Sequence, residues 1–499
     1  MIKILCIFLV YSLSMGTSIG QISQTARLEF EKKDRFSEDY EVVPFGQNGL
    51  ILIKKEFEYL SKNNKWEFSN YSENLQEKWK IEYETPRKQF PLLHYQNTEF
   101  LYWLFAEPDE KTAITILKID ILSGEYEEIK GDLLAVNELS HFQVLGTKAF
   151  FAGKFQSKPV VALFNFFDGG NKVLPNLFLK PTEILVDMKV DNQKKTIIVS
   201  THTQSLKTDC EFSVFEFSNE GKLLNNLNLP ISDHKNLLTA QVIKNDKNEN
   251  LIIGNYGNEC NNLSVGLFAG KESTNPNFSF YDFNAFNHFF DYLGPKKSEK
   301  VQEKIEKKKG TGKEPKLKQN LLIHELKVTK NAIWLVAENY FTNFVNPTIN
   351  NSVYQNGSIF SKRNERNIEN FKFTNAIICK FDLNGKLIWD NSFAMKDLES
   401  EQLFSKIEFN EINNQLLVAY SDNGKISTLK LDENGKEISR QIYEAKDYLG
   451  LQKLKWTEDA LLFEWYNQHF LFTGYQSIST NDNPNGKNRE VFFISKLSF

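Results

Sequence analysis

Histidine, cysteine, serine and carboxylate side chains are the residues of this 499-residue sequence that could carry out nucleophilic, acid–base or metal chemistry. The seven histidines form no HExxH or His-x-His motif and no cluster with cysteine, so the ligand spacing of a zinc site is missing. No G-x-S-x-G nucleophile elbow and no Walker phosphate loop occurs. The sequence therefore predicts no catalytic residue, no metal ligand and no cofactor, and it favours a protein that is not an enzyme.

Carboxylate pairs keep one enzymatic alternative open, because a repeat fold can bring together Asp and Glu residues that are distant in sequence. Two carboxyl groups that flank a glycosidic bond can act as acid and base, or as acid and nucleophile. A glycosidase, a lyase or a lectin-like glycan-binding protein is therefore the alternative function. Ser232, Asp233 and His234 are adjacent in sequence, which is not how a catalytic triad is assembled, and we assign them to a turn.

Two D-x-N-G segments, at 382–385 and 432–435, resemble the start of a calcium-binding loop. An EF-hand needs further oxygen ligands and a terminal Glu at fixed spacing, and neither segment supplies them. Asn-Gly favours the left-handed backbone of a tight turn between two strands. We therefore predict hairpin turns here, and we leave a structural cation open, for example in the long loop at 482–487.

The elements that must position these residues repeat about every fifty residues. Units of four short alternating strands, separated by Asn- and Gly-containing turns, recur at intervals of 48 to 51 residues apart from two longer gaps. Such units predict an all-β fold, an eight-bladed β-propeller of four-stranded antiparallel blades. A seven-bladed ring with a degraded fifth unit is the alternative. The repeat is marked by Ser72, Asp120, Asp168, Ser218, Ala269, Asp382, Asp432 and Ser498.

The two ends of the chain predict how the ring closes. The last unit ends at Phe499 without a fourth strand, and the segment 26–34 is strand-like but has no partner of its own. Pairing this segment as the outer strand of the eighth blade would close the ring and cover an exposed sheet edge.

The segment FDLNGKLIWD, at 381–390, resembles the repeat of quinoprotein-type propellers through Gly385, Lys386 and Trp389. Trp79 takes the place of Trp389 in YSENLQEKWK. The resemblance implies that this Trp stacks between blades and belongs to the fold. The adjacent Cys pair and the calcium-binding residues of a quinone site are not recognisable, so the resemblance implies no quinone cofactor.

The eight repeats also resemble the propeller subunit of the bacterial outer-membrane assembly machinery. This resemblance implies a protein-interaction scaffold that binds an envelope or outer-membrane protein. That subunit is lipid-anchored, whereas the anchoring Cys is missing here: Cys6 lies inside an apolar run, and Gln21 follows Gly20.

The N-terminus has the pattern of a signal peptide, predicted over residues 1–20. Lys3 supplies the basic start, 4–11 the apolar core, and 18–20 a small-x-small cleavage site. We expect residues 21–499 to form a single propeller domain exported to the periplasm, the cell surface or the medium. No later segment is long and apolar enough to span a bilayer, and the formal charge of −4 gives no reason to expect a nucleic-acid partner.

Two inserts interrupt the repeat, at about 283–320 (Lys-rich) and 343–370, and function often lies in such loops. Residues 295–318 hold ten Lys and four Glu, which favours a solvated loop with a short helix at 298–308. The functional alternative is an arm that binds an acidic partner or lipopolysaccharide phosphates. Both inserts and the last loop of the eighth blade follow even-numbered strands, so we expect them on one face. The aromatic residues of the first insert could equally pack against blade five. The predicted interaction residues are Phe286, Phe289, Phe290, Tyr292, Lys307, Lys308, Lys309, Tyr340, Phe344, Tyr354, Arg363, Arg366, His469, Phe470 and Tyr475.

Three cysteines follow the predicted signal peptide, so at least one of them has no disulfide partner within the chain. Cys379 lies in an apolar strand and is predicted to be buried. Cys210 and Cys260 take nearly equivalent positions in consecutive units, and a disulfide between them would join blades 4 and 5. The alternative is that the two loops lie too far apart to bond.

Overall fold

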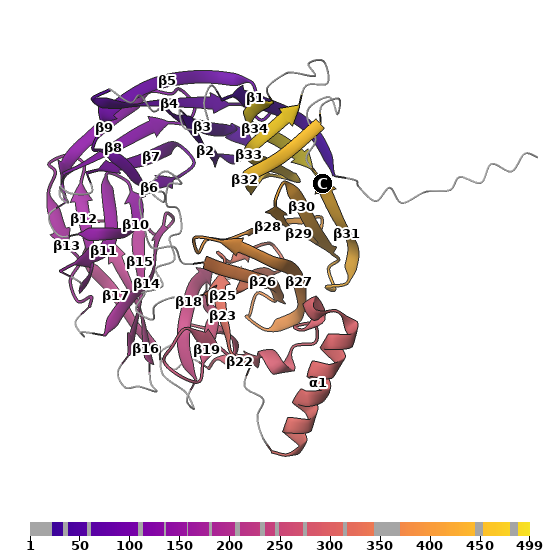
Figure 1. Cartoon of the computed structure of the whole chain (residues 1–499). Coiled ribbons are helices and arrows are strands. Elements are labelled where there is room, and N and C mark those ends of the chain that lie inside the picture. The colour runs from indigo at the N-terminus through magenta and orange to yellow at the C-terminus, as the bar shows by residue number, and fades with distance from the viewer. Residues whose placement is uncertain are drawn as a thin grey trace, which may run out of the picture.

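The chain forms a ring of antiparallel sheets in the computed structural model (Figure 1). No helix of the described residues is long and apolar enough to cross a membrane. The predicted signal peptide and nearly all of the second insert lie outside these residues. The structure describes residues 22–32, 38–56, 61–107, 113–133, 136–156, 158–178, 182–204, 210–229, 235–244, 249–272, 277–312, 317–343, 370–444, 453–479 and 488–499.

Blades 1 to 4 follow one another along the chain as four-stranded meanders. The first strand of each blade lies nearest the centre of the ring and the fourth lies at its rim (Figure 1). The 3-10 helix η1 (Gly46–Asn48) joins the first two strands of blade 1. The strands are β2 (Glu38–Pro44), β3 (Leu50–Glu56), β4 (Asn63–Tyr71) and β5 (Glu77–Pro86) in blade 1; β6 (Phe90–Gln96), β7 (Phe100–Ala106), β8 (Ala113–Asp120) and β9 (Tyr126–Asp132) in blade 2; β10 (Asn137–Leu145), β11 (Lys148–Phe155), β12 (Lys158–Asn165) and β13 (Asn171–Val173) in blade 3; and β14 (Glu183–Asp191), β15 (Thr196–Gln204), β16 (Cys210–Ser218) and β17 (Leu223–Leu229) in blade 4.

Blades 5, 7 and 8 have the same four-stranded order. Their strands are β18 (Asn236–Lys244), β19 (Asn250–Gly257), β21 (Gly266–Lys271) and β22 (Ser279–Asp282) in blade 5; β28 (Ile407–Ile412), β29 (Gln415–Asp422), β30 (Lys425–Leu431) and β31 (Glu437–Glu444) in blade 7; and β32 (Lys453–Tyr466), β33 (His469–Ser479), β34 (Arg489–Ser498) and β1 (Ser23–Glu31) in blade 8.

Blade 6 departs from this regularity. Its innermost strand is split into β23 (Gln319–Ile323) and β24 (Lys327–Val328), which both pair with β25 (Ile333–Asn343), and β26 (Asn370–Phe381) and β27 (Leu387–Ser400) follow outward. The short strand β20 (Leu263–Ser264), from blade 5, adds to the edge of β23. Seven regular blades and this irregular sheet therefore make the ring.

A side chain from blade 5 bonds to the backbone at the split in blade 6. The side chain of Gln241, on β18, donates to the carbonyl oxygen of His324 at 2.9 Å and accepts from the N–H of Leu326 at 3.0 Å. These two backbone groups therefore bond to a side chain at the break between β23 and β24. The seven regular blades match the number in the seven-bladed alternative, but the irregular unit is the sixth and not the fifth.

The predicted closure by the N-terminal strand is confirmed. β1 pairs antiparallel with β34, from Ser23 opposite Ser498 to Glu31 opposite Val491. The Arg27 guanidinium, on β1, donates to the side-chain oxygen of Gln476 at 2.7 Å. The first and last parts of the chain therefore share one sheet, and β34 has a neighbour on both sides.

The D-x-N-G segments form hairpin turns, as predicted. Asp382 Oδ1 accepts from the N–H groups of Asn384 and Lys386, and Asp432 makes the same pair of bonds in its own turn. Gly385 has φ 84°, a left-handed value that side chains other than Gly disfavour.

The repeated Trp packs between blades, as its resemblance to quinoprotein propellers implies. Trp389 Nε1 donates to the carbonyl oxygen of Glu433 in the next blade at 2.9 Å, and its ring lies against Gly435. Trp79 Nε1 donates to the carbonyl oxygen of Ile121 at 3.0 Å, with its ring against Gly124. A Cβ at Gly124 or Gly435 would lie within 2.7 Å of the indole, so both positions require glycine.

Candidate functional site

The basic insert between blades 5 and 6 forms a helix, α1 (Pro295–Gly310), that projects from the rim of the ring (Figure 1). The short 3-10 helices η2 (Phe283–Ala285) and η3 (Asp291–Leu293) precede it. Pro295 opens the helix, where its missing N–H costs nothing. Ile305 is only 7 % exposed and packs toward blades 5 and 6, whereas the seven lysines and three glutamates of α1 are exposed.

The aromatic residues predicted as contacts in this insert instead attach it to the propeller. Phe286, Phe289 and Phe290 are 7, 1 and 5 % exposed and pack in one cluster with Ile305 and strands of blades 5 and 6. The prediction that these three side chains form a contact surface is wrong, because burying their apolar area stabilises the docked insert. The alternative, that they pack against the propeller, is confirmed. Tyr292 is half-buried, and burial raises the pKa of its hydroxyl.

A buried carboxylate on β27 fixes the same insert. Asp390 Oδ1 accepts from the N–H of Asn287 at 2.9 Å, and Oδ2 accepts from the N–H of His288 at 2.7 Å. The Ser392 hydroxyl, on the same strand, donates to the carbonyl oxygen of His288 at 2.8 Å. Burial raises the pKa of Asp390, although the two N–H bonds act in the opposite direction. The lysine-bearing helix is therefore attached to blade 6 at several points.

The remaining predicted contacts do not form one surface. Tyr340 and Phe470 are 5 and 0 % exposed and belong to separate core clusters, so the prediction that they are surface contacts is wrong. Tyr475 packs in a third cluster, and its hydroxyl accepts from the N–H of Tyr40 at 3.1 Å. His469 begins β33, at the end of that strand away from the loop of blade 8. Phe344, Tyr354, Arg363 and Arg366 lie outside the described residues.

Polar and titratable residues that sequence reasoning missed lie on the innermost strands. Each blade contributes at least one, and bonds between blades join many of them. We call this set the axial belt. Its members are Glu41, His94, His141, Asp187, Lys189, Gln241, His324, Glu325, Lys327, Glu408 and Glu464.

Lys189 joins three blades in this belt. Its ammonium donates to Gln241 Oε1 of blade 5 at 3.1 Å and to Glu325 Oε1 of blade 6 at 3.3 Å. On the opposite side of blade 6, the ammonium of Lys327 contacts the Glu464 carboxylate of blade 8 and lies 4.4 Å from the centre of the Phe409 ring of blade 7. Contacts through the belt therefore run from blade 4 to blade 8.

Glu338 lies on β25, the strand next to the innermost strand of blade 6, and is completely buried. One of its oxygens, Oε1, lies 2.6 Å from His324 Nε2 and accepts from the N–H groups of Lys406 and Ile407 at 2.8 Å each. Three polar groups converge on this oxygen, whereas Oε2 is buried without a hydrogen-bond partner among the described residues. This cluster fastens blade 6 to blade 7.

Glu408 is a belt residue whose acidity is altered by burial. Burial raises its pKa from 4.5 to about 7, although the N–H of Glu464 and the nearby Lys327 ammonium oppose this effect. The Glu464 N–H donates to Glu408 Oε2 at 3.1 Å. A carboxyl group with this pKa can take up and release a proton at neutral pH, as a general acid or base does.

A cavity of about 310 Å³ opens between blades 6 and 7, beside Lys327. It lies at the turns that follow the innermost strands, hence at the end of the strands opposite the blade-to-blade connections. Its lining includes two lysine ammonium groups, four asparagine amides, one carboxylate, an indole and a phenyl ring. The lining residues are Lys327, Thr329, Lys330, Asn331, Trp334, Phe409, Asn410, Glu411, Asn413 and Asn414.

Comparison with known proteins gives only weak structural similarities. No family model matches the chain, and no curated protein matches it in sequence. Among solved structures, the dihydro-heme d1 dehydrogenase NirN is 10 % identical, with a TM-score of 0.42 over 95 % of this chain and 79 % of that one. The quinohemoprotein alcohol dehydrogenase from Comamonas testosteroni is 9 % identical, with a TM-score of 0.43 over 95 % and 76 %.

A prolyl endopeptidase is 8 % identical, with a TM-score of 0.37, and this chain spans 50 % of its length. A europium-containing methanol dehydrogenase is 8 % identical, with a TM-score of 0.38. Similarity at this level concerns the arrangement of the blades and carries no activity over to this chain. The protein is a β-propeller because its four-stranded antiparallel sheets form a ring, and its structural resemblance to quinoprotein dehydrogenases is weak.

Proposed function

We propose that this protein is an exported, non-catalytic β-propeller that acts as a scaffold and binds an acidic envelope or outer-membrane protein through α1. The observation that supports this proposal is a lysine face on a helix that is firmly docked. Lys297, Lys300, Lys304 and Lys308 are exposed and lie three or four residues apart, which places them on one side of the helix.

The helix dipole favours Lys308, which lies in the last turn, but it does not account for the other three lysines. Lys300 and Lys308 each lie four residues from Lys304, and like charges at this spacing cost about 0.2–0.5 kcal/mol per pair. Lys296 and Lys297 lie in the first turn, where the helix dipole favours acidic side chains. An acidic partner would offset both costs, and the buried aromatic attachment would spare it the cost of ordering a loose loop.

The test is a pull-down of the tagged protein from gently solubilised cell envelopes, followed by mass spectrometry. A variant with Lys297, Lys300, Lys304 and Lys308 changed to Gln is compared with a control in which Lys62, Lys88, Lys158 and Lys436, all exposed and outside α1, are changed to Gln. We expect an acidic envelope protein in stoichiometric amount with the wild type and the control, at least tenfold less with the α1 variant, and loss of binding in high salt. Equal recovery with both variants would overturn the proposal.

The cavity between blades 6 and 7 favours a second function, binding of an acidic oligosaccharide. The exposed Lys330 can pair with a sugar carboxylate, and the asparagines of the lining can bond to hydroxyl groups. Titration calorimetry with oligogalacturonates tests this function. We expect Lys330→Gln to weaken binding at least fivefold and Lys62→Gln to leave it unchanged; an absence of heat with the wild type would rule the function out for this ligand class.

A further inference from the structure

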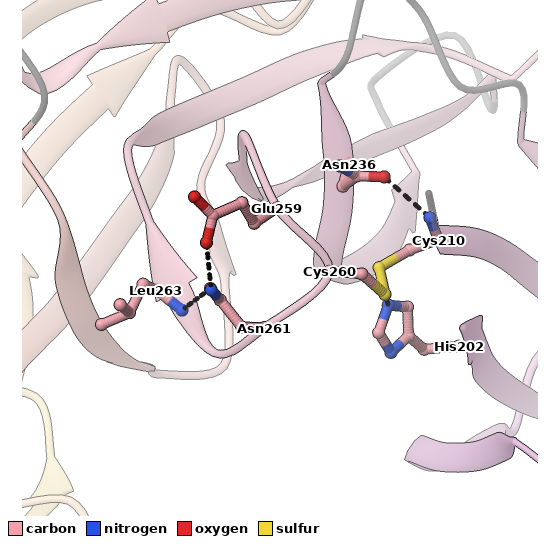
Figure 2. The surroundings of a disulfide bond; sticks show 7 residues. All are labelled: His202, Cys210, Asn236, Glu259, Cys260, Asn261 and Leu263. Atoms are coloured by element: carbon pink, nitrogen blue, oxygen red, sulfur yellow. Dashed lines mark hydrogen bonds between the residues drawn. A yellow bond between two sulfur atoms is a disulfide. The ribbon is translucent and has the colours of Figure 1, made fainter. Parts of the chain in front are cut away.

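A histidine lies against the disulfide that joins blades 4 and 5. Cys210, the first residue of β16, is bonded to Cys260, in the loop after β19, and their Cα atoms are 5.4 Å apart. His202, near the end of β15, places Nε2 3.5 Å from Cys260 Sγ. The ligand atoms of the three residues all lie within 4.8 Å of one another, and Figure 2 shows the imidazole directed at the sulfur pair.

The surrounding backbone holds these residues independently of the disulfide. Asn236 Oδ1 accepts from the N–H of Cys210 at 2.7 Å, and strand pairing between β15 and β16 fixes His202 opposite Phe212. The loop that carries Cys260 has its own bonds: the N–H of Leu263 donates to Asn261 Oδ1 at 2.9 Å (Figure 2). Reduction would therefore leave two thiols and an imidazole close together.

Two cysteines and one histidine are a common ligand set for zinc, with the fourth position left to water or substrate. Zinc-bound sulfurs lie about 2.3 Å from the metal, which in a tetrahedral site separates them by roughly 3.8 Å. The sulfurs must then move apart from their bonded positions, and Cys260 lies in a loop rather than in a strand.

We infer that reduction converts the Cys210–Cys260 disulfide into a zinc site completed by His202. A dithiol reductant supplies two electrons and two protons, the S–S bond breaks to give two thiols, and the reductant becomes a disulfide. Zn²⁺ then displaces the two thiol protons and binds both thiolates and Nε2 of the imidazole. Blades 4 and 5 are thus joined by the disulfide under oxidising conditions and by the metal under reducing ones. This inference does not rest on the proposed role of α1.

The test is metal binding by the full-length protein in its oxidised and reduced states. The protein is reduced with a phosphine and titrated with Zn²⁺, and with Co²⁺ as a spectroscopic substitute that reports thiolate ligands by charge-transfer absorption. We expect one Zn²⁺ per reduced chain, none per oxidised chain, and a higher thermal midpoint with Zn²⁺ in the reduced state only. His202→Ala should weaken binding at least tenfold, and Cys210→Ser with Cys260→Ser should abolish it.

Cys379→Ser is the matched control, because this buried thiol lies outside the cluster, and it should bind Zn²⁺ as the wild type does. The inference is overturned if the reduced wild type binds no stoichiometric Zn²⁺, or if His202→Ala binds it equally well. It is also overturned if circular dichroism shows that the reduced protein is unfolded in the presence of Zn²⁺.

Discussion

Ionisation of a single side chain in the axial belt makes the free energy of unfolding of this protein depend on pH. Glu408 is the clearest case, because burial raises its pKa from 4.5 to about 7. Between pH 4.5 and about pH 7, Glu408 is therefore protonated in the folded state and ionised in the unfolded chain. The free energy of unfolding should therefore fall as the pH rises from about 4.5 to about 7, as far as this residue contributes.

Glu408→Gln tests this at the residue scale. The amide oxygen can still accept from the N–H of Glu464, but the side chain no longer ionises. Each unit of pKa corresponds to about 1.4 kcal/mol, so we expect the variant to be more stable than the wild type at pH 8 by roughly 1–3 kcal/mol, and equally stable at pH 4. Urea unfolding at several pH values measures the difference. The exposed Glu433→Gln serves as a control, and a difference between E408Q and wild type that does not change with pH would contradict the assignment.

At the scale of elements, α1 depends on the aromatic cluster beneath it. A lysine-rich helix of 16 residues has little stability by itself. Ile305 is the apolar residue of α1 that is buried against the propeller. Ile305→Ala removes buried methylene and methyl groups, at a typical cost of 2–5 kcal/mol. We expect amide hydrogen exchange in residues 295–310 to become at least tenfold faster while the strands of blades 1 to 4 keep their protection.

Gln302→Ala, on the exposed side of the same helix, is the matched control and should leave exchange unchanged. If Ile305→Ala left the exchange of α1 as slow as in the wild type, the helix would be held by something other than its apolar contact. Binding of the acidic partner that we propose should weaken along with the docking, because the lysine face would no longer be held in place.

At the scale of the whole molecule, β1 closes the ring. It covers the edge of β34, and the Arg27 guanidinium lies over the Phe493 ring, 4.5 Å from its centre. Removing residues 22–32 would expose a long sheet edge of the kind that pairs with other chains. We expect that shortened chain to unfold at lower urea concentration and to form oligomers in size-exclusion chromatography. A chain that begins at residue 21 should remain as stable as the full sequence, and equal behaviour of the two chains would contradict this role of β1.

The repeat of about fifty residues, the D-x-N-G turns and the strand-like segment at 26–34 were sufficient to predict a closed propeller. These signals are local, because a turn residue or an alternating strand imposes its geometry wherever it occurs in the chain. The same local signals could not show that Gln241 bonds to the backbone at the split in the inner strand of blade 6. Its two bonds go to His324 and Leu326, which lie 83 and 85 positions further along the chain.

The sequence by itself determined the blades, the closing strand, the spacing that suggested Cys210–Cys260, and the concentration of lysine in one insert. Only the tertiary structure decided which aromatic residues are buried, because exposure depends on what a neighbouring blade places against them. It also assembled the axial belt and brought His202 to the disulfide. Each of these groups draws its members from different blades, and the distances between them depend on the curvature of the ring rather than on spacing along the chain.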